Sequence, residues 1–322
     1  MSEPVTALSV VVVNWNTRDL LRGCLESVFR EADGLQLEVW VVDNASSDRS
    51  CEMVAECFPD ARLIRNSENR GFAAANNQAL RAAQGKYTLL LNSDTVVLEN
   101  VLSRSVAYMD DHPAVAVLGC RVLNPDGSMQ PTCFQDPTLL NLTLKVLGLF
   151  RLRWPKWFGK EHMSHWPRDT ERDVDVVTGC YMMVRRTAID EVGLLDEEFF
   201  FCGEESDWCR RFRKAGWKIR FAPIGEIIHH GNASGRRLSY KRDILLTQGL
   251  VLYHKKHGGQ VAAIVAWALL AVFTLLRVAA WTVISAKGDT DARRRRTHFA
   301  MVLKGFGRVW PWHKRGASLI EP

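Results

Sequence analysis

The sequence predicts an α/β protein whose main domain is built on an open, doubly wound and mostly parallel sheet. Three early segments are near-continuous aliphatic and β-branched runs: SVVVV at 9–13, LEVWVVD at 37–43 and YTLLLN at 87–92. Runs without polar alternation are typical of parallel strands that are buried on both faces. Helical stretches lie between the runs, and this alternation predicts a βαβαβ half-sheet.

Helices and further strands follow from local patterns. Residues 18–29 place apolar side chains at helical spacing, and residues 71–84 are rich in alanine and stop at a glycine. Strand character returns at 113–123 and 174–184. Residues 137–167 mix aromatic and basic side chains in a pattern typical of either a lid over a site or ordinary packing.

Length and charge indicate one domain with an appendage. The chain has 322 residues, and α/β units of about this size are often single domains with an addition. We expect residues 1–238 to form one sheet domain and residues 239–322 to form a hydrophobic and basic helical region that associates with a membrane. The net charge of +6 is concentrated late, notably at Arg293–Arg296, which indicates an anionic partner surface.

Cysteine usage and the N-terminus indicate a reducing compartment. The eight cysteines include no C-x-x-C pair, and several lie within apolar patterns, which predicts buried, reduced thiols. The chain reaches a strand-like run by Ser9 without the basic segment, apolar stretch and small-residue cleavage site of a secretory signal. We therefore expect the sheet domain to lie in the cytosol.

Polar clusters follow the three predicted strands at 14–16, 43–46 and 92–94. Ligands of doubly wound sheets bind beyond the carboxyl ends of the strands. Loop chemistry alone explains one such cluster, but three at aligned strand ends predict a binding site.

Asp94 is the candidate ligand for a divalent cation in this site. A carboxylate at a strand end can hold a hard cation whose shell is completed by substrate phosphates. The alternative role for Asp94 is a turn or helix cap. His229 and His230 form an adjacent pair before a glycine, at the end of another apolar run, and are further ligand candidates.

A second acidic cluster, GEESDWCRRF at 203–212, begins a predicted helix that runs from 204 to 215 and stops at a glycine. Glu204 and Glu205 follow three phenylalanines, and apolar neighbours can raise the pKa towards that of a general base, whereas the helix N-terminus opposes this shift. For Asp207 we expect an i,i+4 ion pair with Arg211 instead. The helix face that includes Trp208, Cys209 and Phe212 is expected to face the core.

Seven ordered motifs carry a family resemblance that covers residues 8 to about 235. The motifs are VVVVNWN (10–16), VVDNAS (41–46), NRGFAAANN (69–77), LLLNSDT (89–95), TGCYMMVRR (178–186), DEEFFFCGEESDWCRRFRKAGW (196–217) and HHGNAS (229–234). Together they closely resemble the family 2 glycosyltransferases, and most of all the rhamnosyltransferase-type enzymes of bacterial cell-surface polysaccharide assembly.

The resemblance implies a GT-A fold, a nucleotide-sugar donor and an inverting single displacement. Asp43 would hold the nucleotide base, with Asn14 and Asn16 nearby. The donor pocket would be lined by residues of the third motif, namely Asn69, Gly71 and Asn77.

The resemblance also implies a metal ligand and a general base, but this chain departs from the family's motifs at two positions. Asn92 replaces the first Asp of the D-x-D motif, and Glu205 replaces an Asp. Asn92 and Asp94 stand where the family has its D-x-D motif, so Asp94 would bind Mg²⁺ or Mn²⁺ together with His229, and the donor phosphates would assist. Glu205 stands where the family has a catalytic Asp, which makes it the expected base. Its extra methylene moves the carboxylate by about an ångström, so Glu204 stays open as an alternative.

The expected substrates follow from the same resemblance. The donor would be a dTDP- or UDP-sugar, with dTDP-rhamnose as the first choice. The acceptor would be a polyprenyl-diphosphate-linked or other cell-envelope glycan. A UDP-hexose transferase and a catalytically silent nucleotide-sugar-binding scaffold are the alternatives. Nucleic acid is not an expected partner, because the basic run adjoins an apolar segment that indicates lipid.

Residues 261–286 are long enough to cross a bilayer and carry one charge, Arg277. A single crossing would place Arg293–Arg296 on the far side from a cytosolic domain, against the positive-inside preference. We therefore expect peripheral or monotopic attachment to the anionic inner leaflet, on the cytoplasmic face of the plasma membrane, through an interfacial helix or a re-entrant hairpin. Residues 298–312, which interleave aromatic and basic side chains, suit this arrangement. The alternative is a buried helix of a soluble protein.

Overall fold

The computed structural model describes two compact units of the chain. The described residues are 6–32, 34–149, 163, 166–231, 239–286 and 288–310. The sheet unit comprises residues 1–136, 162–198 and 204–234, and the helical unit comprises residues 137–161, 199–203 and 235–322. Trp154, Trp157 and Phe158 of the expected lid lie outside the described residues, and so do Asn232–Ser234 at the end of the seventh motif.

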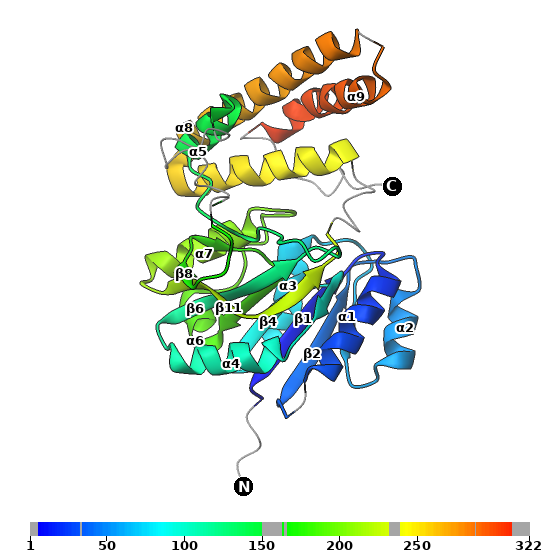
Figure 1. The fold of residues 1–322 in the computed structure, drawn as a ribbon, viewed down its shortest axis with the longest axis vertical. Helices are drawn as coiled ribbons and strands as arrows, with labels where there is room; N and C mark the ends of the chain where they lie inside the picture. The colour runs from blue at the N-terminus through cyan, green and yellow to red at the C-terminus, as the bar shows by residue number, and fades with distance from the viewer. Residues whose placement is uncertain are drawn as a thin grey trace. The chain divides into compact units, whose positions relative to one another are not determined.

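The sheet unit is built on a nine-stranded mixed sheet, counted over the described residues (Figure 1). Its strands are β1 (Leu8–Asn14), β2 (Leu37–Asp43), β3 (Arg62–Arg65), β4 (Tyr87–Asn92), β5 (Thr95–Val97), β6 (Val115–Leu123), β8 (Arg172–Asp173), β10 (Tyr181–Arg185) and β11 (Lys218–His229). The main order is β3-β2-β1-β4-β10-β6-β11-β5, and β8 pairs with β11. A separate ribbon joins β7 (Cys133–Phe134) to β9 (Val176–Val177). The predicted doubly wound α/β class is confirmed.

The strand register brings the predicted polar clusters to one edge. β1 lies between β2 and β4 and is parallel to both, so the chain switches direction across the sheet at β1. Asn14 is paired with Asp43, and Val13 with Asn92. The carboxyl ends of all three strands therefore lie at the same edge of the sheet, which is where open α/β sheets bind ligands.

Two parts of the sheet differ from the sequence prediction. β3 was not predicted, because its four residues lie at the sheet edge and begin and end with exposed arginines, which leaves no apolar run. The expected strand at 174–184 is divided into β9 and β10 by a turn at Gly179. A Cβ at Gly179 would lie 2.8 Å from Phe72 and 3.2 Å from Glu205 Oε1, so the chain passes too close to both for a side chain.

Helices cover both faces of the sheet. One face packs against α1 (Arg18–Arg30), α2 (Ser50–Cys57) and α4 (Val101–Asp111), and the other against α3 (Phe72–Ala82), α6 (Arg186–Val192) and α7 (Glu204–Lys214). Trp208, Cys209 and Phe212 of α7 are fully buried, as predicted. The described cysteines form no disulfide, and five of the eight are buried.

The helical unit contains α5 (Leu139–Val146), α8 (Ser239–Ser285), α9 (Thr290–Lys304) and the short helix η3 (Gly305–Val309). Its longest helix, α8, is interrupted at Gly259, where φ is 75° and ψ is −171°. Trp281 of α8 lies under Arg295, and Trp267 donates to the Phe306 carbonyl. The return chain therefore runs antiparallel to the second part of α8.

The apolar segment at 261–285 is one continuous helix within α8, so the re-entrant hairpin, one of the two arrangements expected for it, does not form inside this segment. The chain turns back only after Ser285. By length and composition this is the one described helix that could cross a membrane, and its most apolar window is only 22% buried. Such exposure is unlike that of a core helix and is compatible with membrane association.

Candidate active site

Asp43 is held by the loops that follow β1 and β2. Its Oδ1 accepts from Asn14 Nδ2 at 2.9 Å, and its Oδ2 accepts from the Ser46 N–H at 2.9 Å. Asn14 Nδ2 also donates to Ser46 Oγ at 3.1 Å. Asn14 and Asp43 are both buried. The carboxylate is therefore fixed in orientation and, as an acceptor, suits a ligand that presents an N–H.

Asn16 joins the same two loops. It adopts a left-handed conformation with φ of 54°, which asparagine tolerates better than most residues. Its N–H donates to Ser46 Oγ at 2.9 Å, and its Oδ1 accepts from the Ser47 N–H at 2.8 Å. Asn16 therefore braces the rim of the crevice beside Asp43.

Asn44 forms hydrogen bonds with the third motif (69–77) and so holds it at this edge of the sheet. The sequence alone did not distinguish Asn44 from the rest of the cluster at 43–46. Its Nδ2 donates to Asn69 Oδ1 at 3.0 Å and to the Gly71 carbonyl at 3.2 Å. Its Oδ1 accepts from Asn66 Nδ2 at 3.0 Å. The structure thus brings Asn69 and Gly71 beside the end of β2.

Asn77 lies apart from this cluster. Its Nδ2 donates to the Leu195 carbonyl at 2.8 Å and to Glu197 Oε1 at 2.9 Å, and its Oδ1 accepts from the Leu195 N–H at 3.1 Å. These bonds use both amide hydrogens and the oxygen. Asn77 therefore ties α3 to the chain after α6, and this arrangement leaves it little capacity to contact a donor.

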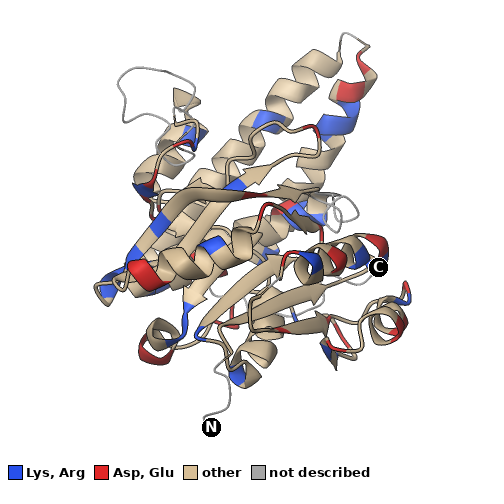
Figure 2. Ribbon diagram, turned by 60° about the horizontal axis from the view of Figure 1, so that its bottom comes forward, with Lys and Arg blue, Asp and Glu red and all other residues tan. Residues whose placement is uncertain are grey.

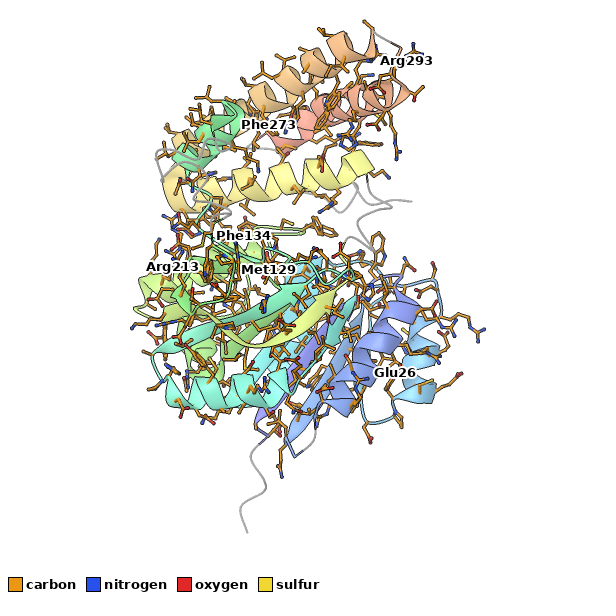
Figure 3. All side chains as sticks on the ribbon, viewed as in Figure 1. Glu26, Met129, Phe134, Arg213, Phe273 and Arg293 are labelled. Carbon is orange, nitrogen blue, oxygen red and sulfur yellow. The ribbon has the colours of Figure 1, made fainter. Side chains whose placement is uncertain are left out.

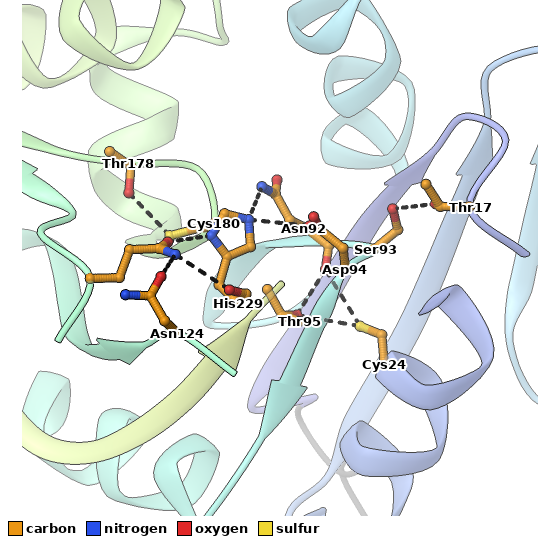
Figure 4. Close-up of polar contacts among 11 residues, drawn as sticks. Thr17, Cys24, Asn92, Ser93, Asp94, Thr95, Asn124, Thr178, Cys180 and His229 are labelled. Carbon is orange, nitrogen blue, oxygen red and sulfur yellow. Dashed lines mark hydrogen bonds and ion pairs between the residues drawn. The ribbon is translucent and has the colours of Figure 1, made fainter. Parts of the chain in front are cut away.

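The Asn92–Asp94 turn faces His229 (Figure 4). His229 Nε2 lies 3.2 Å from Asp94 Oδ1 and 3.2 Å from Asn92 Nδ2. The His230 N–H donates to the Asp94 carbonyl at 2.9 Å, which fastens the end of β11 to the turn. The side chain of His230 is exposed. Of the two candidate histidines, His229 is the one whose ring faces Asp94.

Gln130 contacts the other side of the His229 ring and was missed from the sequence. Its Oε1 lies 2.5 Å from His229 Nδ1. A signal was present, because the N-P-D-G turn after β6 returns the chain alongside the strand end. The partner lies 99 positions away, so the turn alone gave no reason to select Gln130.

Asp94 and His229 fit a divalent cation as a partial ligand set. Ligands about 2.1 Å from an octahedral ion lie about 3.0 Å apart at adjacent corners, close to the separation of 3.2 Å between Asp94 Oδ1 and His229 Nε2. The described residues contain no group of three or more His, Cys, Asp and Glu side chains arranged for a metal. Such an ion would therefore need further oxygen ligands from a substrate.

Glu205 and the Asn92–Asp94 turn both form hydrogen bonds with the backbone of Gly179 and Cys180. The Gly179 N–H donates to Glu205 Oε1 at 3.0 Å, and the Cys180 carbonyl accepts from the Asn92 N–H at 3.3 Å. The two acidic clusters, which are more than 100 positions apart in the sequence, therefore flank one short turn.

Glu204 and Glu205 differ in burial. Glu204 is 3% exposed, and its Oε2 has no hydrogen-bond partner among the described residues, whereas Glu205 is half-buried. Burial raises the pKa of Glu204 well above its usual value, and the neighbouring Glu205 adds to this shift. Burial also raises the pKa of Glu205, but the Gly179 N–H opposes it. Burial therefore favours the protonated form of Glu204 more strongly than that of Glu205. The predicted Asp207–Arg211 pair is confirmed at 2.8 Å.

Glu204→Gln is expected to stabilise the folded protein at pH values above the ordinary pKa of glutamate. Because the folded-state pKa is raised, the stability contributed by the protonated group is complete at acid pH and is lost as pH rises. Glutamine keeps the neutral form at every pH. Thermal melting should give matching midpoints near pH 4.5 and a midpoint roughly 2–4 °C higher for the variant near pH 8. A constant difference across this range would contradict the assignment.

Solved structures define the class of the fold. A mannosyltransferase from Pyrobaculum calidifontis in complex with GDP-Man and Mn²⁺ superposes with a TM-score of 0.55 at 19% identity, covering 98% of this chain and 92% of that one. GalNAc-T7 with UDP, GalNAc and Mn²⁺ superposes with a TM-score of 0.51 at 16% identity, covering 71% and 44%. The sheet unit is thus a GT-A-type fold, the fold of nucleotide-sugar glycosyltransferases.

Sequence comparison assigns the family. The model of glycosyl transferase family 2 matches residues 9–193, more than half of the chain, which therefore belongs to this family. An N-acetylglucosaminyl-diphospho-decaprenol L-rhamnosyltransferase of Mycobacterium tuberculosis is 27% identical over 245 residues, 71% of this chain and 78% of the relative. The resemblance to rhamnosyltransferases of polysaccharide assembly is confirmed. The protein is an inverting-type family 2 glycosyltransferase.

Proposed function

We propose that the protein transfers a sugar, with L-rhamnose from dTDP-rhamnose as the first choice, to a polyprenyl-diphosphate-linked or other cell-envelope glycan. The carrying observation is that Asp94, His229 and Glu205 gather around one turn at the carboxyl end of the sheet. The similarity to a rhamnosyltransferase whose name specifies a diphospho-decaprenol acceptor supports this choice of substrates.

Asp43 would receive the nucleotide base. Its carboxylate can only accept hydrogen bonds, and Asn14 and Ser46 already orient it. Thymine and uracil present the N3–H that such an acceptor binds, so both dTDP and UDP donors fit. Asn69 and Gly71 would line the donor pocket beside it, whereas Asn77 would support the pocket from behind.

Asp94 and His229 would hold Mg²⁺ or Mn²⁺ at the donor diphosphate. When bound, this ion neutralises the charge that develops on the leaving diphosphate. Asn92 Nδ2 donates to His229 Nε2, and the Asn92 amide offers at most a neutral oxygen. Asp94 is thus the one carboxylate of this pair, so we expect metal binding to require donor phosphates.

Glu205 would take the proton from the acceptor hydroxyl as that oxygen attacks the sugar carbon. The oxygen–carbon bond forms on the face opposite the departing diphosphate, which inverts the configuration. Glu205 suits this role because it is partly exposed and because the Gly179 N–H, which donates to it, opposes the rise in its pKa on burial. Glu204 is buried and its pKa is raised further, so we assign it a supporting role.

Donor assays test the proposed function directly. Membranes containing the protein should transfer sugar from dTDP-rhamnose to a lipid-linked N-acetylglucosamine acceptor when Mg²⁺ or Mn²⁺ is present. Transfer from a UDP-hexose alone would favour the second candidate, which the UDP-bound neighbour of the same fold supports. If no donor is transferred or hydrolysed under any condition, the protein is a silent nucleotide-sugar-binding scaffold.

We also propose that the helical unit binds the anionic inner leaflet at the cytoplasmic face of the plasma membrane. Along α8 the exposed positions Val261, Val265, Val272, Leu276 and Val283 recur at helical spacing and form one apolar stripe. At 1.5 Å per residue this stripe is roughly 33 Å long. Figure 2 shows a long helix that is uncharged over most of its length, with charged segments towards its tip.

The charges of the helical unit are arranged to suit an interface. Arg277, the one charge of the apolar segment, is packed over the rings of Phe273 and Phe299 at 3.8 and 5.5 Å (Figure 3). Arg293–Arg296 are all exposed on α9. Basic side chains near an anionic surface contribute about 1 kcal/mol each, so the stripe and the arginines together favour an interfacial position. Lys314 and Arg315 lie outside the described residues.

Leu276→Glu is expected to weaken attachment to the membrane, because it places a charge at the middle of the apolar stripe. In vesicle flotation with anionic lipids, the bound fraction should fall by at least about tenfold, which corresponds to the cost of about 2–3 kcal/mol for a charge at such a position. Leu276→Met is the matched control and should bind like the wild type. Release of the wild-type protein by high salt without detergent would contradict attachment through the stripe.

A further inference from the structure

A series of hydrogen bonds leads from the turn after β6 to His229, and each bond fixes the direction of the next. Asp126 is an acceptor at one end. The Ser128 hydroxyl donates to Asp126 Oδ1 at 2.6 Å, which commits its proton. Ser128 Oγ accepts in turn from Asn124 Nδ2 at 2.9 Å. The oxygen of the Asn124 amide therefore faces the next residue, Gln130.

Gln130 can occupy only one of its two amide orientations. Its Nε2 donates to Asn124 Oδ1 at 2.7 Å and to the backbone carbonyl of His229 at 3.3 Å. Both partners are oxygen acceptors, so a flipped amide would oppose oxygen to oxygen twice. Gln130 Oε1 must then face His229 Nδ1, and this nitrogen must carry the hydrogen that lies between them.

The backbone holds Gln130 in place for this contact. The Gly127 N–H donates to the Asn124 carbonyl at 2.9 Å, and Gly127 has φ of +80°, a conformation that favours glycine. The Gln130 N–H donates to the Val122 carbonyl at 2.8 Å. The turn is thus closed at both ends, and the backbone of Gln130 is held beside the end of β6.

The hydrogen on Nδ1 decides the state of the opposite ring nitrogen, His229 Nε2. When Nδ1 carries the hydrogen, Nε2 of a neutral imidazole presents a lone pair. That lone pair accepts from Asn92 Nδ2 and faces Asp94 Oδ1, both at 3.2 Å, and a cation bound at Nε2 would replace the Asn92 hydrogen bond. Two acceptors at this distance repel each other unless a cation or a proton lies between them.

We propose that Gln130 is a positioning residue that, backed by Asn124, Ser128 and Asp126, keeps His229 in the Nδ1–H form so that Nε2 is directed at the metal. The inference rests on the proposed metal-dependent transfer. Partners that orient a ligand histidine in this way typically contribute 10–100-fold to metal affinity. Gln130 itself does not touch the reacting atoms.

The affinity for Mn²⁺ in the presence of saturating dTDP or UDP tests this role, with free Mn²⁺ measured by electron paramagnetic resonance. Gln130→Met preserves length but removes the acceptor, and it should weaken Mn²⁺ binding by about 10–100-fold. Gln130→Glu keeps an acceptor for Nδ1–H but loses the donor to Asn124 and to the His229 carbonyl, so it should weaken Mn²⁺ binding less than Gln130→Met does. Met129→Leu, at the neighbouring position, is the control and should leave the affinity unchanged.

A second readout uses the metal-free protein. With ¹⁵N-labelled histidine at about pH 8, where imidazole is neutral, the His229 signals are identified by their loss in His229→Asn. They should report a protonated Nδ1 and a bare Nε2, and Gln130→Met should shift them towards the other form.

Three results would overturn the inference: a protonated Nε2 in the wild type, unchanged Mn²⁺ affinity in Gln130→Met, or equal weakening in Gln130→Glu. Absence of Mn²⁺ binding by the wild type with either nucleotide would instead count against the proposed function. The nitrogen signals would then still decide whether Gln130 sets the form of the ring.

Discussion

Glu205→Gln is expected to lower kcat for sugar transfer by about 10²–10⁴-fold, the usual contribution of a positioned general base. Glutamine has the same shape and can still accept from the Gly179 N–H, which donates to Glu205 Oε1 at 3.0 Å. It cannot take up the acceptor proton. The affinity for the nucleoside diphosphate, measured by calorimetry, should stay close to that of the wild type.

Glu204→Gln is the matched control for this experiment. It makes the same change at the adjacent residue, where burial raises the pKa and favours the neutral form, which glutamine imitates. We expect most of the transfer activity to survive. Near-normal turnover in Glu205→Gln would remove Glu205 from the mechanism, and loss of activity only in Glu204→Gln would exchange the two roles.

Asp94→Asn is expected to have the second largest effect on catalysis. It removes the only carboxylate of the pair that faces the proposed metal position, since its partner there is His229. We expect kcat/KM to fall by about 10²–10³-fold, in the range found when one stabilising group for developing charge is lost. Raising the Mn²⁺ concentration should restore part of the rate, because the defect lies in metal binding.

Asn92→Asp provides the reciprocal test. It supplies the second carboxylate that the turn lacks, so this variant should bind Mn²⁺ without any donor nucleotide, whereas the wild type should bind it only with one. Activity of Asp94→Asn that is unaffected by metal concentration or by a chelator would show that transfer does not depend on the cation.

The parts of the fold that the sequence predicted are those with an uninterrupted physical signal. β1, β2 and β4 are buried on both faces and therefore read as continuous apolar runs. β3 lies at the edge and has two arginines in four residues, so the same rule could not detect it. The re-entrant hairpin, one of two arrangements considered for 261–286, is wrong because charge distribution alone does not show where a helix turns.

Asp94 and the two glutamates were selected as candidates from residue type and position, whereas the role of Asp43 is implied by the family resemblance. Asn44 and Gln130 were missed because their importance comes from partners distant in the sequence. Asn77 shows the opposite case. It lies in a motif that matches the family, but its amide forms hydrogen bonds with the backbone of Leu195. The distinction between Glu204 and Glu205 required burial, which adjacent positions in a sequence do not reveal.

The turn at Gly179 and Cys180 makes one backbone segment responsible for two alignments. Through its N–H it sets Glu205, and through its carbonyl it sets the strand end that carries Asn92. A displacement of this segment would therefore shift both Glu205, the proposed base, and the strand end next to the proposed metal position. Natural or engineered changes of sugar specificity should accordingly accumulate in the surrounding loops, while this segment stays constant across enzymes that differ in both substrates.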